Sequence, residues 1–254
     1  MSSLSNAISD VSSRTFSDLA LPAPLIKALV NQGITTPTPV QDAVIPDALT
    51  GANVLGRART GSGKTLAFGV PVLVALAGGT SRPKAPRGLI ILPTRELATQ
   101  VREALDPLAD ALGLRLATVY GGTSIDRQIK RLRSGVDVVI ATPGRLEDLI
   151  DRRTCTLDDV LITVLDEADH LCDLGFFKPI DRILSQTPVN GQRLLLSATL
   201  DGDVNRLVKK HLPKHVLHEL DAADGHESSM EHHVLVTAPT EKVATAKNLL
   251  AANP

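Results

Sequence analysis

Aromatic residues and cysteines are scarce in this sequence. Its 254 residues contain four Phe, one Tyr and no Trp, so aliphatic side chains must fill the core. An aromatic platform on which several nucleic-acid bases stack is therefore not expected. The two cysteines, Cys155 and Cys172, belong to no Cys-x-x-Cys or Cys/His cluster, which argues against a zinc site and a disulfide scaffold. This cysteine usage fits a reducing compartment, and we expect a cytoplasmic protein.

An excess of one charge and a long apolar run are also lacking. The 27 basic and 28 acidic residues give a net charge of −1, which excludes a polybasic tail or a histone-like binder. The most apolar stretch, residues 66–77, is broken by Gly69 and Pro71 and is shorter than the roughly 18 residues that span a bilayer. Residues 1–15 are rich in serine and lack the apolar core of a signal peptide. We therefore expect no membrane partner.

Short β-rich runs alternate with longer amphipathic segments from residue 53 onward. The expected strands are residues 53–57, 88–92, 115–120, 137–141, 160–165, 192–197 and 215–220, and the expected helices are 64–77, 94–112, 125–134, 145–151, 178–186 and 204–211. Runs such as ITVL and LLLS are apolar on both faces, as buried parallel strands are. The pattern predicts an α/β fold with a largely parallel twisted sheet and helices on both faces.

The domain organisation follows from where this alternation begins and ends. Residues 1–15 have no regular apolar period and predict a disordered tail, whereas residues 16–220 predict one domain. Residues 221–230 predict a linker, because residues 219–231 include five acidic and no basic side chains. Residues 231–254 predict one strand and one helix, too little to bury a core of their own. We expect them to begin a second domain, with the chain stopping just inside it.

A glycine-rich segment, ARTGSGKT at residues 58–65, follows the first predicted strand and opens a helix. Such a turn lets backbone N–H groups close around phosphate oxygens at a helix N-terminus. We expect Thr60, Gly61, Ser62 and Gly63 to form this loop, with Lys64 reaching the terminal phosphates and Thr65 coordinating magnesium. The strict pattern has glycine where this chain has Ala58. The alternative is a tight turn with a surface lysine.

An acidic tetrapeptide, Asp166 to Asp169, follows the buried strand ITVL. Residues 158–181 include seven acidic side chains and one basic side chain, and so much negative charge favours a bound cation. Because magnesium prefers carboxylate and water oxygens, we assign it to Asp166, through water, and to Thr65. Glu167 could then polarise a water that attacks a γ-phosphate. The alternative is an acidic helix N-terminus, which is itself stabilising.

With both motifs at strand ends, the chain resembles the N-terminal RecA-like lobe of a DEAD-box ATP-dependent RNA helicase. The other family signatures follow in order: GITTPTPVQ at 33–41, PTRELA at 93–98, Gly121-Gly122, TPGR at 142–145 and Ser197-Ala198-Thr199. The resemblance covers the chain from about Phe16 to its end. It implies ATP and Mg²⁺ as ligands, catalytic roles for Lys64, Asp166 and Glu167, and RNA-stimulated ATP hydrolysis that opens short RNA duplexes.

The resemblance also implies recognition of adenine. Gln41 would pair with the adenine edge, which suits an amide with both a donor and an acceptor, and Phe16 would stack on the ring. The alternative is that Gln41 only caps its own helix, because Thr38-Pro39-Val40-Gln41 is a capping box with proline at the first helical position.

RNA contact and coupling rest mainly on the resemblance. It implies that a sugar–phosphate backbone is bound, without regard to base sequence, by Pro93, Thr94, Arg95, Gly122, Thr142, Gly144 and Arg145. The local charge agrees, at +3 for residues 82–103 and +2 for residues 121–153, but a solvated helix face would show similar numbers. Ser197 and Thr199 would bond to Asp169 and so couple nucleotide state to RNA grip, the alternative being ordinary helix capping.

None of the residues assigned above is an arginine that would stabilise the negative charge on the γ-phosphate. In the resembled family such arginines belong to the second lobe, so we expect an incomplete catalytic site with weak nucleotide affinity and little unwinding. We also expect a monomer whose partners are RNA and the second lobe of the same protein. Two other functions stay open: a different nucleotide-driven machine, such as a DNA helicase or transport ATPase, and a non-catalytic module that acts through a partner.

Overall fold

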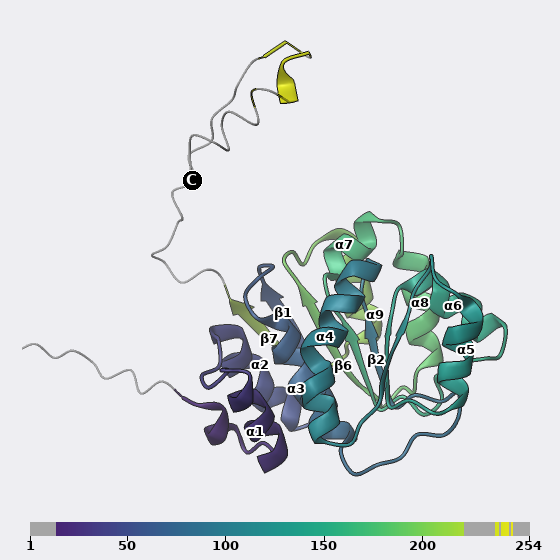
Figure 1. Cartoon of the computed structure of the whole chain (residues 1–254). Helices are drawn as coiled ribbons and strands as arrows, with labels where there is room; N and C mark the ends of the chain where they lie inside the picture. The colour runs from purple at the N-terminus through teal and green to yellow at the C-terminus, as the bar shows by residue number, and fades with distance from the viewer. Residues whose placement is uncertain (1–13, 221–236, 239, 244, 246–254) are drawn as a thin grey trace, which may run out of the picture. The chain divides into compact units, whose positions relative to one another are not determined.

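The computed structural model describes residues 14–220, 237–238, 240–243 and 245 (Figure 1). The chain divides into two compact units, Met1–Asp221 and Ala222–Pro254. The expected tail at 1–13, the expected linker at 221–230 and most of the expected second-domain fragment at 231–254 lie outside the described residues. In the second unit, the backbone N–H groups of Glu241 and Thr245 donate to the carbonyls of Ala238 and Glu241.

The first unit is built on a seven-stranded sheet in which every paired strand is parallel to its neighbour. The strands are β1 (Asn53–Ala58), β2 (Gly88–Ile91), β3 (Leu116–Val119), β4 (Val138–Ala141), β5 (Ile162–Leu165), β6 (Gln192–Ser197) and β7 (His215–Leu220). Their order across the sheet is β3-β4-β2-β5-β6-β1-β7, so β3 and β7 form the two edges. Strands β2, β4 and β5 are buried along their whole length, because helices cover both faces. The predicted α/β fold with a parallel sheet is confirmed.

The helices separate into two layers, one on each face of the sheet (Figure 1). The first layer contains α1 (Ala23–Asn31), α2 (Pro39–Leu49), α3 (Lys64–Leu76) and α4 (Arg95–Ala111). The second contains α5 (Ile125–Arg133), α6 (Pro143–Asp151), α7 (Ala168–Asp173), α8 (Phe177–Gln186) and α9 (Gly202–His211). Alternate strand residues belong to the two cores: Ile90 packs with the first layer and Leu89 with the second. Because all seven strands are parallel, their carboxyl ends lie at one rim of the sheet, where the predicted motifs also lie.

The sequence predicted every strand, and every helix after β1 except α7, to within about two residues. Of the elements before β1, the 3-10 helix η1 (Phe16–Leu19) and α1 were not predicted, and α2 was predicted only by the capping box at its start. Helix α7 has six residues, which is too short for a clear period of 3.6 residues, whereas α1, of nine residues, lies before the alternation that begins at residue 53. Helix α6 also begins two residues earlier than expected, because Pro143 occupies its first turn, where the missing N–H costs no hydrogen bond.

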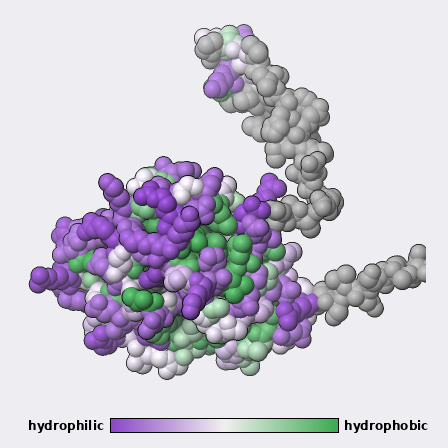
Figure 2. All heavy atoms as spheres, turned by 180° about the vertical axis from the view of Figure 1, so that it is seen from behind, coloured by the Kyte–Doolittle hydropathy of each residue, from purple (hydrophilic) through white to green (hydrophobic). Residues whose placement is uncertain are grey.

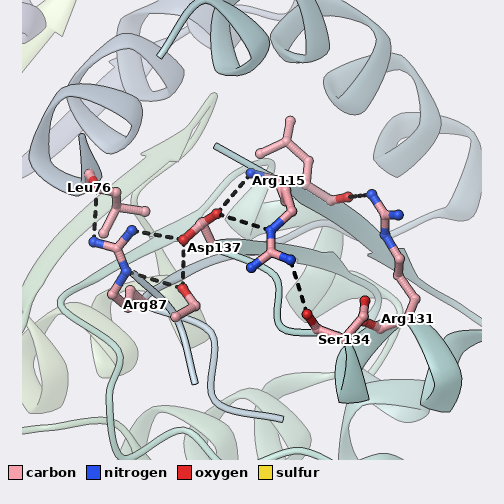
Figure 3. A network of polar contacts seen from close by, with 8 residues as sticks. Leu76, Arg87, Arg115, Arg131, Ser134 and Asp137 are labelled. Carbon is pink, nitrogen blue, oxygen red and sulfur yellow. Dashed lines mark hydrogen bonds and ion pairs between the residues drawn. The ribbon is translucent and has the colours of Figure 1, made fainter. Parts of the chain in front are cut away.

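A buried ionic network joins the strands at the opposite rim (Figure 3). The carboxylate of Asp137, which precedes β4, accepts hydrogen bonds from the Arg87 guanidinium at 2.8 Å, the Ser81 hydroxyl at 2.7 Å and the Arg115 backbone N–H at 2.9 Å. Arg87 also donates to the carbonyl of Leu76 at the end of α3, at 2.9 Å. Burial opposes ionisation of Asp137, but these hydrogen bonds hold its pKa below the usual value. The network thus fixes β2, β3 and β4 in register.

Hydrophilic residues dominate the face shown in Figure 2, with smaller apolar areas between them. The large apolar side chains exposed in the described residues are Val30, Leu161, Leu174, Val189, Val216, Leu217 and Val243. Among them, Val216 and Leu217 are adjacent on the edge strand β7. Within the part of the chain described, no helix is long and apolar enough to cross a bilayer.

Candidate nucleotide and RNA site

The glycine-rich segment lies where the sequence places it, between the end of β1 and the start of α3. Gly63 caps α3 in the left-handed region at φ 97°, and a Cβ there would lie 2.6 Å from Nε2 of Gln41. Both features require glycine. Ala58, which replaces the glycine of the strict pattern, is the buried last residue of β1 and is accommodated in the sheet. The loop therefore presents the start of α3 at the carboxyl rim, as a phosphate-binding turn does.

Gln41 joins α2 to this loop. Its Oε1 accepts the backbone N–H of Thr38 at 3.0 Å, which is the capping contact, and its Nε2 donates to the carbonyl of Gly63 at 3.0 Å. The side chain is only 3% exposed. One amide therefore serves both helix capping and loop positioning in this structure, and its pairing with adenine stays a prediction.

Lys64 is held by the acidic residues after β5. Its ammonium lies 2.8 Å from Oε1 of Glu167 and 3.9 Å from Oδ1 of Asp166, with the lysine side chain 5% exposed. The Thr60 hydroxyl donates to the same Glu167 oxygen at 3.1 Å. Residues more than one hundred positions apart are thus brought together because β1 and β5 flank β6. The Lys64 ammonium, which is expected to bind the terminal phosphates, therefore lies beside two carboxylates. These are Asp166, expected to hold magnesium, and Glu167, expected to activate water.

The two carboxylates have different surroundings. Burial raises the pKa of Asp166 to about 7, with the charges of Glu167 and Asp169 adding to the effect and Lys64 opposing it. Glu167 has a left-handed backbone, with φ 51°, as the residue that precedes α7. A non-glycine residue pays roughly 1–2 kcal/mol for this conformation. In this conformation the Glu167 carboxylate contacts the Thr60 hydroxyl and the Lys64 ammonium.

These residues line one hollow of about 460 Å³, formed by the loop, the end of β5 and helix α4. Its lining includes Thr60, Gly61, Gly63, Lys64, Thr65, Asp166 and Glu167. A carboxylate and a hydroxyl oxygen in one hollow fit Mg²⁺, which binds through one or two carboxylates, water and substrate phosphates. The described residues contain no group of three or more His, Cys, Asp or Glu side chains that could hold a metal by themselves. Thr65 and Asp166 therefore suit a magnesium ion that arrives with a nucleotide.

Phe16 lies in the hydrophobic core of the first helix layer and is 1% exposed. Its backbone N–H donates to the carbonyl of Thr35, which ties it to the segment before α2. Stacking on a base needs one uncovered ring face. The structure shows a packing role for Phe16, and its stacking on adenine stays a prediction.

Asp169 and the Ser-Ala-Thr segment after β6 are in direct contact. The Asp169 carboxylate accepts the backbone N–H groups of Ala198 at 3.2 Å and Thr199 at 3.0 Å, and the Thr199 hydroxyl at 3.3 Å. The Asp169 N–H donates to the Ser197 hydroxyl at 3.0 Å. Burial opposes ionisation of Asp169, yet the N–H groups of His170 and Thr199 hold its pKa below the usual value. The structure therefore contains the hydrogen bonds between Asp169 and the segment Ser197–Thr199 that coupling of nucleotide state to RNA binding would need.

The predicted RNA residues come from three segments on the same rim: the starts of α4 and α6 and the loop after β3. Thr94 and Thr142 are the N-caps of α4 and α6. A Cβ on Gly122 would lie 3.1 Å from Nη1 of Arg95, and Nη1 of Arg145 donates to the carbonyl of Thr123 at 3.2 Å. Gly122 and Gly144 are exposed, but Pro93 is buried and offers little surface. The structure brings the set together around the loop after β3.

A family model described as DEAD/DEAH box helicase matches residues 38–207, which span the phosphate-binding loop, the acidic motif and the Ser-Ala-Thr segment. The chain belongs to the DEAD/DEAH box helicase family. A crystal structure of a DEAD box protein from Methanococcus jannaschii matches with a TM-score of 0.77 and 32% identity, over 93% of this chain and 63% of that one. A structure described as a hypothetical ATP-dependent RNA helicase from Sulfolobus tokodaii gives 0.71 and 35%, over 78% of this chain and 56% of that one.

Curated relatives of this DEAD/DEAH box chain carry helicase names. The DEAD-box ATP-dependent RNA helicase CshA of Streptococcus pneumoniae TIGR4 is 42% identical over 79% of this chain and 38% of its own length. The protein of that name from Bacillus subtilis strain 168 is 37% identical over 93% of this chain and 47% of its own length. The chain thus spans less than half the length of these two relatives.

Sequence reasoning missed two features of this rim. The contact of Gln41 with Gly63 was not predicted, because residues 22 positions apart meet only through the packing of α2 on α3. Tyr120, Arg127 and Arg131 line a hollow beside the loop after β3. Sequence reasoning assigned Tyr120 no role and counted the two arginines only toward the local charge. The arginine spacing of four on a predicted helix was the available signal, since such residues share one face.

Proposed function

We propose that this domain binds ATP with Mg²⁺ and a single-stranded RNA backbone, as part of an enzyme that hydrolyses ATP to open short RNA duplexes. The observation that carries the proposal is the contact of Lys64 with Glu167 and Asp166 in the hollow of the phosphate-binding loop. A buried ammonium and two carboxylates beside a helix N-terminus are the groups that phosphoryl transfer requires.

Lys64 would exchange partners when ATP binds. Its ammonium would leave Glu167 for the terminal phosphates, whose negative charge and helix-end position compensate for the lost ion pair. Glu167 would then be free to orient the attacking water and take its proton. Thr65 and Asp166 would hold Mg²⁺, which supplies neutralisation of the phosphate charge. Thr60, whose hydroxyl donates to Glu167, would close the loop over the phosphates.

Gln41 and Phe16 are proposed to recognise adenine. Gln41 is already fixed beside the loop by Thr38 and Gly63, so an adenine edge that reached it would be placed relative to the phosphates. Phe16 would have to uncover one ring face to stack on the base. The amide offers one donor and one acceptor, which match adenine and mismatch guanine.

RNA would bind along the rim formed by Thr94, Arg95, Gly122, Thr142, Gly144 and Arg145, with Pro93 shaping the turn. Hydroxyls and helix N-termini hold phosphates without reading bases, so binding would be independent of sequence. Asp169, Ser197 and Thr199 would transmit nucleotide state to this rim. The catalytic site would be completed by arginines of a second lobe, in a monomeric protein. The free thiols Cys155 and Cys172 support a cytoplasmic location.

Fluorescence anisotropy with labelled single strands tests the RNA part of the proposal. We expect two RNAs of unrelated sequence to bind equally, a DNA of the same sequence to bind less well, and affinity to fall as salt rises. Arg145→Gln should weaken binding, whereas Arg152→Gln should not, because Arg152 is exposed and paired with Asp148. Affinity that follows one base sequence and ignores salt would contradict the proposal, and preference for DNA would favour a DNA-dependent enzyme.

A further inference from the structure

A second hollow of about 380 Å³ lies on the outer side of the edge strand β3, between α4 and α5. It is lined by Arg102, Thr118, Tyr120, Thr123, Ser124, Arg127, Gln128 and Arg131. None of these side chains belongs to the nucleotide hollow or to the predicted RNA set. Three of them are arginines, and none of the lining residues is acidic.

The arginines have donors to spare. Each guanidinium carries five N–H donors in a planar fork that fits a phosphate. Within the described residues, Arg102 gives one to Asp106 at 3.0 Å. Arg131, which Figure 3 labels, gives one to the carbonyl of Leu116 at 3.4 Å. In that same part of the chain, Arg127 has neither a hydrogen bond nor an ion pair. The hollow therefore has more positive charge than its own surroundings neutralise.

The wall of the hollow is fixed in position. Nε2 of Gln128, a residue only 9% exposed, donates to the carbonyl of Tyr120 at 2.9 Å and to the hydroxyl of Thr123 at 2.7 Å. The Tyr120 hydroxyl lies 3.4 Å from the Thr99 hydroxyl on α4. These contacts hold the loop after β3 between the two helices. A ligand that binds in the hollow therefore does not have to order this loop, which lowers the entropy cost of binding.

The same loop borders the predicted RNA rim. Thr123 accepts from Arg145 at 3.2 Å through its carbonyl, and Gly122 lies against the Arg95 guanidinium, while Tyr120 and Thr123 line the hollow. A strand that left the rim over this loop would pass the hollow that Arg127 lines. Helix α5 carries four basic residues and one acidic residue, so the charge continues in that direction.

We propose that the α4–α5 hollow is an accessory RNA site, in which Arg127 and Arg131, assisted by Arg102, bind a backbone phosphate of the strand after it leaves the rim. This inference rests on the proposed RNA binding and adds one phosphate contact to it. The site recognises phosphate charge and not base identity, because the lining offers guanidinium and hydroxyl groups at the edge of the sheet.

The salt dependence of RNA binding tests the inference. The pair Arg127→Gln/Arg131→Gln removes two charges that line the hollow, and the matched pair Lys130→Gln/Arg133→Gln removes two from the same exposed helix outside it. Affinity for RNAs of about 6 and about 12 nucleotides, the range of site sizes of single-strand-binding folds, is measured between roughly 50 and 200 mM salt. Thermal melts of both variants test whether they fold. Arg127→Lys/Arg131→Lys, which keeps the two charges, should restore part of the affinity.

The hollow pair should weaken binding of the longer RNA by about tenfold and flatten the plot of log affinity against log salt by about 0.7. The matched pair should change the affinity for the longer RNA and the slope of this plot much less. The shorter RNA should bind to the unaltered chain and to both variants with equal affinity. RNA binding with equal slopes for the two pairs would overturn the inference and leave the proposed function standing. Binding of a polyglutamate peptide that requires Arg127 and Arg131, while RNA binding does not, would assign the hollow to an acidic protein instead. Failure of the unaltered chain to bind RNA would overturn both proposals.

Discussion

The ammonium of Lys64 lies 2.8 Å from the carboxylate of Glu167, and both side chains are largely buried. The group expected to bind phosphate is therefore paired with the group expected to activate water. If ATP binds here as proposed, nucleotide binding would also release Glu167, because phosphates that attract Lys64 would free the carboxylate. This exchange would restrict water activation to the nucleotide-bound state.

Glu167→Gln should separate binding from chemistry. Loss of the carboxylate charge removes the competitor for Lys64, so affinity for ATP with Mg²⁺ should stay unchanged or tighten by up to about tenfold. Glu96→Gln is the control, since Glu96 is exposed and paired with Arg95. Titration with a fluorescent ATP analogue measures the affinity. Weaker binding by Glu167→Gln would show that the carboxylate supports the nucleotide and does not compete with it.

Gln41→Ala should reduce affinity for ATP more than affinity for GTP. Both nucleotides lose the support that Gln41 gives to Gly63, but only adenine loses a matched amide, worth about 1–3 kcal/mol. Competition titrations with the two nucleotides measure the difference. Gln32→Ala is the control, because Gln32 is exposed and its side chain bonds only to the carbonyl of Ala28 within the described part. Equal losses for ATP and GTP would leave Gln41 with capping and loop support alone.

Removal of the hydroxyls in Ser197→Ala/Thr199→Val should uncouple the two activities of a complete enzyme. Asp169 keeps the backbone N–H groups of Ala198 and Thr199, so the fold should persist while one side-chain donor and one acceptor are lost. RNA unwinding should fall more than ATP hydrolysis when both are measured on one preparation. Ser185→Ala, whose hydroxyl bonds to a carbonyl within α8, is the control. A proportional loss of both activities would count against coupling.

Asp137→Asn should destabilise the domain by about 2–4 kcal/mol at neutral pH, because it leaves the buried Arg87 without its carboxylate. The folded pKa of Asp137 is below its usual value, so its contribution is complete above the unfolded pKa of about 3.9 and is lost as pH falls through the lower folded pKa. Urea unfolding at pH values from about 7 to 3 measures this. The difference from the unaltered chain should be constant above pH ~5 and shrink in acid, whereas Asp110→Asn, on an exposed residue, should have little effect at any pH.

The carboxyl-end motifs were predictable because each follows an apolar strand, and parallel strands end at one rim. In this way β5 was predicted from the run ITVL before Asp166, and β6 from the run LLLS before Ala198. The start of β5 was predicted two residues early, because Val160 and Leu161 extend the apolar run, whereas the paired strand begins at Ile162. Val160 is buried and Leu161 is 52% exposed, so apolar character alone did not mark the point where strand pairing begins.

Contacts between distant segments were harder to predict. The sequence left Gln41 with two competing roles, whereas packing of α2 on α3 lets one amide cap the helix and hold Gly63. The basic residues of α5 looked like a solvated face, because charge counts do not show which side chains converge. Only the packing of α4 and α5 beside the edge strand β3 places Arg102, Arg127 and Arg131 around one hollow.

Calorimetric titration of the chain with ATP, with and without Mg²⁺, tests the central claim most directly. The unaltered chain and Lys209→Ala, an exposed control on α9, should bind ATP in a Mg²⁺-dependent manner. Lys64→Ala, folded as judged by its thermal melt, should lose at least about tenfold in affinity, because a charged hydrogen bond to phosphate is removed. Equal ATP binding by Lys64→Ala and the unaltered chain would contradict the assignment of this loop and its two carboxylates as the nucleotide site.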